Sequence, residues 1–330
     1  MKVLLLGATG LLGHNVLQRL MAEGHEVVAL VRRANGIRLQ QGGWQMIVGS
    51  PLDYEVLAKS AEGCDAIVNC AGCTDMSLRR YEDFLPVNRD LCQMLVRLMD
   101  EQGIGILVHT STVDTLNEVR SFYADSKREG EQIILEAAKE GRHVVAINPG
   151  FMLGPWDVKP SSGRMLLAAY RKPLMFAPKG GKAFVHVSDV AQAIVNALAR
   201  GENGVRYIAV NGQSCLSIRE LYEIQAKVCG YRQKVFLAPN WLLLTAGRVG
   251  DVLRWIGVKT QVSTCNIKQL LVREYYDSSR AISDLGMPQT LIEEAIKEFH
   301  EWRKNNQCYE ESDSIAVSAG ATGSLPQPSE

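Results

Sequence analysis

The sequence has no excess of charge of either sign. Its 330 residues include 36 Lys and Arg and 36 Asp and Glu, so the formal net charge is zero with His neutral. Proteins that hold a nucleic-acid backbone by bulk electrostatics carry a basic excess. Nucleic acid is therefore not an expected partner. With 46% hydrophobic and 22% charged residues, the chain has the composition of an ordinary globular protein.

The sequence also lacks an apolar run long enough to cross a membrane. Residues 3–6 are apolar, but glycines interrupt the run too early for a signal peptide. The stretch 241–258 contains Arg248, Asp251 and Arg254, so it does not span a bilayer, although its apolar residues recur at helical spacing. We predict an amphipathic helix that forms core or pocket wall; a face lying on a membrane interface is the alternative. We expect a cytoplasmic protein without stable membrane insertion.

Cysteine shows no pattern of a disulfide framework. The eight cysteines are scattered, which favours reduced thiols. Cys70 and Cys73 form a CxxC pair, but no second pair or nearby His completes a tetrahedral metal site. We expect no metal and interpret the pair as packing, with a redox or metal role as the alternative.

Short apolar runs alternate with helical periodicity through the first half of the chain. The runs predicted as strands, buried on both faces, are residues 3–6, 26–31, 45–48, 66–69, 106–109 and 144–148. The predicted helices are residues 11–22, 54–61, 89–101 and 126–139. This alternation predicts an α/β fold with a doubly wound parallel sheet.

Pro149-Gly150 breaks the alternation, and the second half is mixed. Apolar runs at 183–187 and 205–210 alternate there with helical segments at 190–199 and 218–229. We predict a first domain at 1–150 and a smaller mixed α/β lobe at 151–305, with some elements returning to the first domain. Residues 306–330 are rich in Ser, Gly, Ala and Pro and are predicted to be a disordered tail.

A glycine-rich turn, Gly7-Ala8-Thr9-Gly10-Leu11-Leu12-Gly13, follows the first strand and opens a helix. Gly7 permits the tight turn, Gly10 lets a pyrophosphate approach the backbone, and Gly13 lets the helix pack closely on the strand. Amides near Leu11 and Leu12 then face the phosphate from a helix N-terminus. The turn predicts a dinucleotide site on a Rossmann-type sheet, although its first gap is one residue longer than the standard fingerprint.

The end of the second strand indicates which dinucleotide is bound. An acidic residue there would hydrogen-bond the ribose 2′-hydroxyl of NAD, whereas Arg accommodates the 2′-phosphate of NADP. The sequence has Arg32-Arg33 and no acid at this position. A guanidinium can meet a phosphate with paired hydrogen bonds, so NADP(H) is favoured over NAD(H). A solvated pair of surface arginines is the alternative.

Tyr123 and Lys127 are four residues apart at a predicted helix start, on one helical face. A nearby ammonium favours the phenolate, so we expect Lys127 to lower the pKa of Tyr123. Such a phenol can exchange a proton with an alcohol or a carbonyl. The pair is informative because it follows both the glycine turn and a hydroxyl-rich strand end, Thr110-Ser111-Thr112.

These motifs together resemble the extended short-chain dehydrogenase/reductases over about residues 1–304, with the dihydroflavonol-reductase-like branch nearest. Further matching stretches are Asn69-Cys70-Ala71-Gly72, Val87-Asn88, Asn148-Pro149-Gly150, 184–191 and Asp277-Ser278-Ser279-Arg280. The resemblance implies that Tyr123 is the general acid/base, that Lys127 is its electrostatic partner and a ribose ligand, and that Thr112, or alternatively Ser111, is the catalytic hydroxyl.

The same resemblance implies further cofactor contacts. Pro149 and Met152 would line the nicotinamide, and Cys70, Ala71 and Thr74 the middle of the cofactor. Where the family often has Gly-Asp after the third strand, this chain has Gly49-Ser50-Pro51, so Ser50 would make a weaker or different contact. The segment between Thr112 and Tyr123 is also short for an extended member.

The second lobe offers less specific signals. The stretch from Gly154 to Arg164 is predicted at the pocket mouth or, equally, as a structured connection between lobes. His186 is interpreted as a packed histidine rather than a second acid/base. A partly apolar substrate is predicted from a pocket of Phe151, Trp156, Met165, Phe176 and the helix that begins at Trp241.

The sequence therefore predicts an NADP(H)-dependent oxidoreductase that reduces a carbonyl, or oxidises the alcohol, of a small molecule. An NAD-dependent nucleotide-sugar epimerase or dehydratase is the first alternative. A non-catalytic dinucleotide-sensing protein is the second, although such a protein has no need of both Tyr123 and Lys127. The sequence leaves open whether the protein forms a homodimer.

Overall fold

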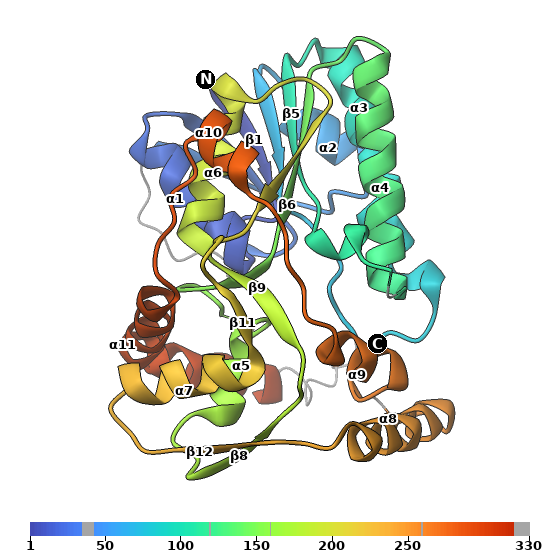
Figure 1. Ribbon diagram of the computed structural model, residues 1–330. Coiled ribbons are helices and arrows are strands. Elements are labelled where there is room, and N and C mark those ends of the chain that lie inside the picture. The colour runs from blue at the N-terminus through green and yellow to red at the C-terminus, as the bar shows by residue number, and fades with distance from the viewer. Residues whose placement is uncertain (35–42, 119, 159, 259, 320–330) are drawn as a thin grey trace, which may run out of the picture.

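A parallel seven-stranded sheet forms the centre of the first lobe (Figure 1). The computed structural model describes residues 1–34, 43–118, 120–158, 160–258 and 260–319. The strand order is β10-β6-β5-β4-β1-β2-β3, and every neighbouring pair is parallel. The strands are β1 (Lys2–Leu6), β2 (Glu26–Val31), β3 (Trp44–Val48), β4 (Ala66–Asn69), β5 (Ile106–Thr110), β6 (Val144–Pro149) and β10 (Val205–Ala209). The predicted doubly wound parallel sheet is confirmed.

Helices cover both faces of this sheet, which explains why its inner strands are apolar throughout. Val3 and Leu5 of β1 face α1 (Leu11–Ala22) and α6 (Val187–Arg200). Leu4 and Leu6 face the other layer, made of α2 (Tyr54–Ser60), α3 (Leu91–Gln102) and α4 (Phe122–Lys139) (Figure 1). Successive side chains of a strand point to opposite faces, so a doubly covered strand needs apolar residues at every position.

Strand β3 differs from its prediction. We expected residues 45–48 to be buried on both faces, but Met46 and Val48 are 38% and 53% exposed. The reason is position: β3 is an edge strand and pairs only with β2. An apolar run alone does not distinguish an edge strand from a central one.

The second lobe is built from segments on either side of α6 and β10. Its strands are β7 (Phe151–Leu153), β9 (Gly181–His186) and β11 (Cys215–Ser217) in one sheet, and β8 (Leu174–Ala177) with β12 (Lys234–Leu237) in a two-stranded ribbon. Its helices include α5 (Gly163–Ala169), α7 (Ile218–Val228), α8 (Asn240–Trp255), α9 (Thr264–Leu271) and α11 (Ile292–Ala319). Phe184, Leu221 and Phe299 lie in its core. The short helix α10 (Ser279–Leu285) packs back on α6 and β10.

Two segments differ from the sequence expectation. Helix α11 continues to Ala319, into the stretch where we predicted disorder from residue 306; residues 320–330 lie outside the described part. Helix α8 is amphipathic as predicted, but it does not lie in the core, because only Gly247 and Gly250 of the helix are buried. No helix in the described ranges is long and apolar enough to cross a membrane.

Candidate active site

The residues predicted to bind the cofactor gather at one edge of the sheet. In a parallel sheet all carboxyl ends meet there, and Gly7, Arg32, Ser50 and Cys70 directly follow β1 to β4 or lie within two residues of their ends. The strand order reverses at β1: β2 and β3 lie on one side of it, and β4, β5 and β6 lie on the other. Ligands of open α/β sheets bind outside the carboxyl ends at such a reversal of strand order.

The glycine turn fits the pyrophosphate of a dinucleotide. Gly7 has a φ of +82°, and a Cβ there would lie 2.6 Å from the carbonyl carbon of Cys70. A Cβ on Gly13 would lie 2.1 Å from the oxygen of Gly7, whereas a Cβ on Gly10 would meet only that same oxygen, at 3.4 Å. Packing therefore requires glycine at positions 7 and 13, whereas Gly10 leaves open space beside the backbone. No side chain caps the N-terminus of α1, so its first amides are available to an anion.

The positions predicted around the adenosine half are mostly exposed. Arg32 and Arg33 follow the end of β2 and are exposed, and so is Thr74, which was predicted at the middle of the cofactor. The Arg32 guanidinium is near enough to Cys73 to favour its thiolate, although burial raises the pKa of that thiol overall. The hydroxyl of Ser50 accepts a hydrogen bond from the Leu52 amide at 3.2 Å. Residues 35–42, which follow the arginines, lie outside the described residues.

Helix α4 carries the predicted tyrosine and lysine on one face. The hydroxyl of Ser121 accepts a hydrogen bond from the Ala124 amide at 3.1 Å and so fixes the helix start at Phe122. Tyr123 and Lys127 are then one turn apart, and Glu131 follows one turn later on the same face. Lys127 and Glu131 are both buried.

The side chain of Thr112 lies close to the hydroxyl of Tyr123. Burial is the main cause that raises the pKa of Tyr123, and the nearby Asp114 carboxylate raises it further, while the Thr112 side chain opposes both. The expectation that Lys127 lowers this pKa is therefore wrong for the structure described. The Lys127 ammonium instead donates to the carbonyl of Thr110 at 2.5 Å, and burial lowers the pKa of Lys127.

Ser111, the alternative catalytic hydroxyl, turns away from the tyrosine. Its hydroxyl donates to the carboxylate of Glu131. That same carboxylate accepts from the Asn148 amide at 2.8 Å and from the Thr115 hydroxyl at 3.1 Å, and it pairs with Arg206 of β10. This buried network fixes the segment that carries Thr112. Our sequence reasoning missed Glu131, although its place four residues after Lys127, on the helix face that carries Tyr123 and Lys127, was a usable signal.

The second lobe contributes a buried ion pair near the same segment. Lys182 of β9 pairs with Glu274, and Glu274 also accepts from the Asn117 amide at 3.1 Å. The Tyr276 hydroxyl donates to Asn117. Burial raises the pKa of Glu274 despite its lysine partner. Asn117 follows Thr112 by five residues, so this network connects the second lobe to the candidate catalytic segment. Nothing in the sequence spacing links residues 117, 182 and 274.

The stretch from Gly154 to Arg164 is a packed connection between the lobes. The Trp156 ring stacks on His14 of α1 with centroids 4.0 Å apart, and the Asp157 carboxylate accepts from the Gly163 amide at 2.8 Å. Arg164 is exposed and donates to the carbonyl of Pro160. These contacts favour the connection over the pocket mouth.

Two further expectations for the second lobe can be compared with the structure. His186 accepts from the Ser188 amide at the start of α6, as expected of a packed histidine. The predicted apolar pocket is not assembled. Phe151 packs edge-on against Phe184, and Phe176 is 61% exposed on the β8–β12 ribbon.

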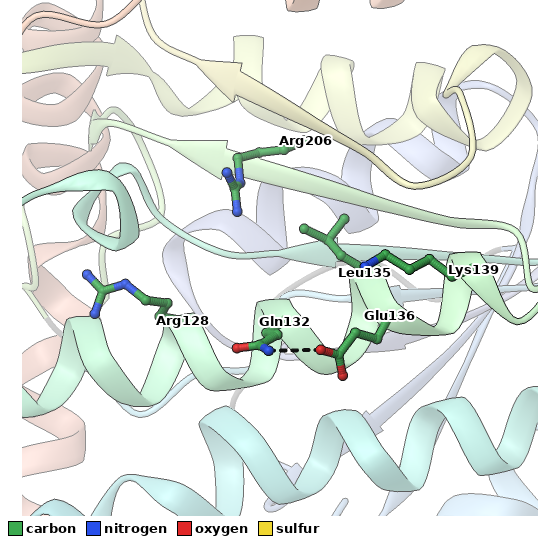
Figure 2. A pocket seen from close by; sticks show the side chains of 6 residues that line it. All are labelled: Arg128, Gln132, Leu135, Glu136, Lys139 and Arg206. Atoms are coloured by element: carbon green, nitrogen blue, oxygen red, sulfur yellow. Dashed lines mark hydrogen bonds between the residues drawn. The ribbon is translucent and has the colours of Figure 1, made fainter.

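A shallow hollow of about 330 Å³ lies on the outer face of α4 (Figure 2). Figure 2 shows it lined from that helix, with Arg206 reaching in from β10; the helix residues are Arg128, Gln132, Leu135, Glu136 and Lys139. Tyr123 and Lys127 are not among its lining residues. The hollow therefore lies behind the site, and we assign the chemistry to the carboxyl edge of the sheet instead.

The CxxC cysteines are free thiols. The Thr110 hydroxyl donates to the sulfur of Cys70 at 3.6 Å, and burial raises the pKa of Cys70 to about 12. Such a thiol is not a reactive thiolate at neutral pH. Within the described ranges, no three His, Cys, Asp or Glu side chains are grouped so as to hold a metal ion.

The fold and this site geometry agree with a known family. Residues 3–211 match the model of the NAD dependent epimerase/dehydratase family. The chain belongs to this family. It is thus an NAD(P)-dependent oxidoreductase of the extended short-chain dehydrogenase/reductase type, as the sequence motifs predicted.

Comparisons with individual proteins agree over most of the chain. A protein of Synechocystis sp. named after dihydroflavonol 4-reductase is 28% identical over 91% of this chain and 94% of its own length. Sterol demethylase protein B of Methylococcus capsulatus is 26% identical over 92% and 98%. The structure of MoeE5 in complex with UDP-glucose and NAD superposes with a TM-score of 0.73 at 20% identity, covering 93% of this chain and all of that chain. The last likeness shows the shared fold.

Proposed function

We propose that the protein is an NADP(H)-dependent oxidoreductase that reduces a carbonyl, or oxidises the corresponding alcohol, of a small molecule. The observation that carries the proposal is the proximity of the Thr112 side chain to the Tyr123 hydroxyl beside the carboxyl edge of the sheet. Two hydroxyl groups that lie side by side can both bind one substrate oxygen. The name of the Synechocystis relative supports a reductase.

Tyr123 acts as the proton donor in the reductive direction. Its raised pKa keeps the phenol protonated at neutral pH, so it can deliver a proton to the oxygen that becomes an alkoxide. Thr112 donates a hydrogen bond to the same oxygen and stabilises its developing charge. When bound, a nicotinamide supplies the hydride. Lys127, whose ammonium donates to the carbonyl of Thr110, would hold the ribose of the cofactor.

The preference for NADP(H) rests on Arg32. This side chain is exposed at the end of β2, and we find no ion pair for it among the described residues. The adjacent position carries a second arginine rather than an acid. Paired hydrogen bonds from a guanidinium to a 2′-phosphate would favour NADPH over NADH.

A sugar-nucleotide epimerase or dehydratase is the second candidate, and the name of the matched family favours it. Such an enzyme recycles its cofactor, so it would retain NAD through purification. Release of a dinucleotide on denaturation, identified as NAD by mass spectrometry, would support this candidate. Recovery of the protein without NAD would favour the reductase.

The test of the reductase is oxidation of NADPH with a panel of aldehydes and ketones. We expect turnover with the wild type and a loss of at least about a hundredfold in Tyr123→Phe, because the proton donor is removed. Tyr275→Phe is the matched control, since Tyr275 is 64% exposed on the surface. Unchanged turnover in Tyr123→Phe with normal NADPH binding would refute the assigned role.

A further inference from the structure

Helix α8 exposes an apolar face with no charged residue. Gly247 and Gly250 lie against Thr264 and Val262, so the helix touches the rest of the lobe along its glycine side. The opposite arc, about 120° wide at 100° per residue, carries Trp241, Leu242, Val249, Val252, Leu253 and Ile256. All six are between 37% and 69% exposed. Trp255, beside this arc, is 85% exposed.

The β8–β12 ribbon carries a second exposed apolar face. Its register pairs Phe176 with Phe236 and Leu174 with Lys234, so these four side chains share one face. The two phenylalanine rings lie 6.2 Å apart and are 61% and 52% exposed. Only Ala238 and Pro239 separate β12 from α8, and the ribbon and the helix lie at the same end of the molecule (Figure 1). We call the α8 arc and this ribbon face the apolar end.

The two sequence stretches that carry the apolar end are rich in basic residues, in a chain without net charge. Between Glu223 and Glu274 the sequence has eight Lys and Arg and one acidic residue, Asp251. Between Asp157 and Asp189 it has six Lys and Arg and no acidic residue. These two stretches contain β8, β12, α8 and α9.

The basic side chains of the apolar end are also available. Lys172, Lys179, Lys234 and Arg248 are exposed, and none of them pairs with a carboxylate in the described part of the chain. The acidic charge of Asp251 is engaged within the helix pair, where the carboxylate accepts from the Thr264 amide at 3.2 Å.

We propose that the apolar end docks the protein on the surface of an anionic lipid bilayer, with α8 lying in the plane of the interface. An apolar arc inserts among the acyl chains while the unpaired Lys and Arg meet lipid phosphates. Trp241 and Trp255, near the two ends of α8, are the residue type that concentrates at membrane interfaces. A second copy of this chain is a poorer occupant, because a two-fold interface would bring this basic surface against itself.

The docked surface is joined to the candidate active site. Arg254 of α8 donates to the carbonyl of Leu78 at 2.5 Å, and Arg79 donates to the carbonyl of Arg254 at 2.5 Å. Cys265 of α9 donates to the carbonyl of Arg120 at 3.3 Å, three residues before Tyr123. Docking would thus place the segment that leads into α4 near the membrane. The docking itself does not depend on which reaction the site performs.

Co-sedimentation with lipid vesicles tests the proposal. We expect the wild type to bind vesicles of phosphatidylcholine and phosphatidylglycerol in equal parts, and to bind phosphatidylcholine alone at least about tenfold more weakly. Val252→Ser combined with Trp255→Ser should lower binding to the anionic vesicles at least about tenfold. Lys234→Glu combined with Arg248→Glu should do the same and should remove most of the dependence on salt.

Matched controls separate the apolar end from general surface effects. Leu291→Ser removes an equally exposed apolar side chain elsewhere, and Lys139→Glu reverses a charge on the outer face of α4; both should bind like the wild type. Dinucleotide binding by every variant checks folding.

Two outcomes would overturn the proposal. One is failure of the wild type to prefer anionic vesicles. The other is a dimer in sedimentation velocity that Val252→Ser with Trp255→Ser dissociates, which would make this face an interface between copies.

Discussion

The hydroxyl of Ser111 donates a hydrogen bond to the carboxylate of Glu131, whereas the side chain of the adjacent Thr112 lies close to the hydroxyl of Tyr123. Two neighbouring hydroxyl residues therefore face opposite ways at the end of β5. We propose that Thr112 acts on a substrate oxygen, whereas Ser111 belongs to a buried network that supports the strand end.

Replacing Thr112 should affect turnover and leave cofactor binding unchanged. We expect Thr112→Val to lower kcat by about ten- to a hundredfold, because a donor to the developing oxyanion is lost. Thr112→Ser should recover most of the activity, since it restores the hydroxyl. Steady-state kinetics with NADPH titrations measure both effects. Full activity in Thr112→Val, with loss in Ser111→Ala, would reverse the assignment.

Glu131 should be a positioning residue with a large effect on stability. Its buried carboxylate accepts from Ser111, Asn148 and Thr115 and pairs with Arg206. We expect Glu131→Gln to lower the free energy of unfolding by about 2 to 4 kcal/mol, because a buried pair loses one partner.

Urea denaturation measures this effect, with a variant of the same helix as control. Glu136→Gln, on the exposed side of α4, should change the unfolding free energy by less than about 0.5 kcal/mol. If added salt restored the folding of the Glu131→Gln variant, and this variant then bound substrate and turned over normally, the network would serve stability alone. A kcat that stays low in folded protein is the result we expect of a positioning role.

The glycines of the turn should separate into two classes. Gly13→Ala places a Cβ 2.1 Å from the Gly7 oxygen and should destabilise the fold. Gly10→Ala meets nothing closer than 3.4 Å, so it should fold normally yet bind NADPH at least about tenfold more weakly, because the methyl group occupies the approach of the pyrophosphate. Thermal melting and NADPH titration distinguish the two. Gly212→Ala, with open space around it, is the control, and unchanged NADPH affinity in Gly10→Ala would exclude this approach.

Arg32 should control the choice between the two dinucleotides. We expect Arg32→Ala to raise the Kd for NADPH about tenfold or more and to leave the Kd for NADH nearly unchanged, since only NADPH carries the 2′-phosphate. Arg33→Ala is the matched control. Isothermal titration of both cofactors provides the measurement. Equal losses for NADPH and NADH in Arg32→Ala would mean that the guanidinium does not recognise the phosphate.

His14 should make the protein sensitive to acid. Burial lowers the pKa of His14 from 6.5 to about 4, so the native state keeps it neutral while the unfolded state binds a proton below about pH 6.5. The stabilisation from a neutral His14 is complete above that pH and is lost as the pH falls toward 4, by about 3 kcal/mol in total. His14→Phe, which keeps the ring against Trp156, should reduce the loss.

The measurement is urea unfolding at pH 7.5 and pH 5. Burial also lowers the pKa of His300 to about 4, so the variant should retain part of the acid sensitivity. An unchanged difference between the two pH values in His14→Phe would show that this imidazole is not the responsive group.

Much of the first lobe could be predicted from the sequence because its signals are local. The glycine turn, the apolar strands and the starts of α1 and α2 depend on neighbours in the chain, and α1 was predicted with its observed bounds. The Tyr123 and Lys127 pair was also local, because helical spacing places both on one face. The pKa values of Tyr123 and Lys127 could not be predicted from local spacing, because they depend on burial and on contacts with Asp114 and Thr110.

The second lobe was less predictable because its signals join distant segments. Nothing near Glu274 in the chain indicates that Lys182 lies beside it. For α8, the apolar spacing gave the helix but not its surroundings. Gly247 and Gly250 let α8 pack on α9 along the side of the helix that lacks side chains, which leaves the apolar arc of α8 exposed. Periodicity identifies an apolar face without saying what covers it.

The position of β10 has a consequence for how the chain acquires its structure during synthesis. This edge strand pairs with β6, yet 55 residues that form three strands of the second lobe separate Pro149 from Val205. During synthesis on the ribosome, β6 therefore remains an exposed edge strand until the second lobe has begun to emerge. An unpaired apolar edge is a template for wrong pairing. Truncation after residue 150 should accordingly yield an aggregating product rather than an independently folded half.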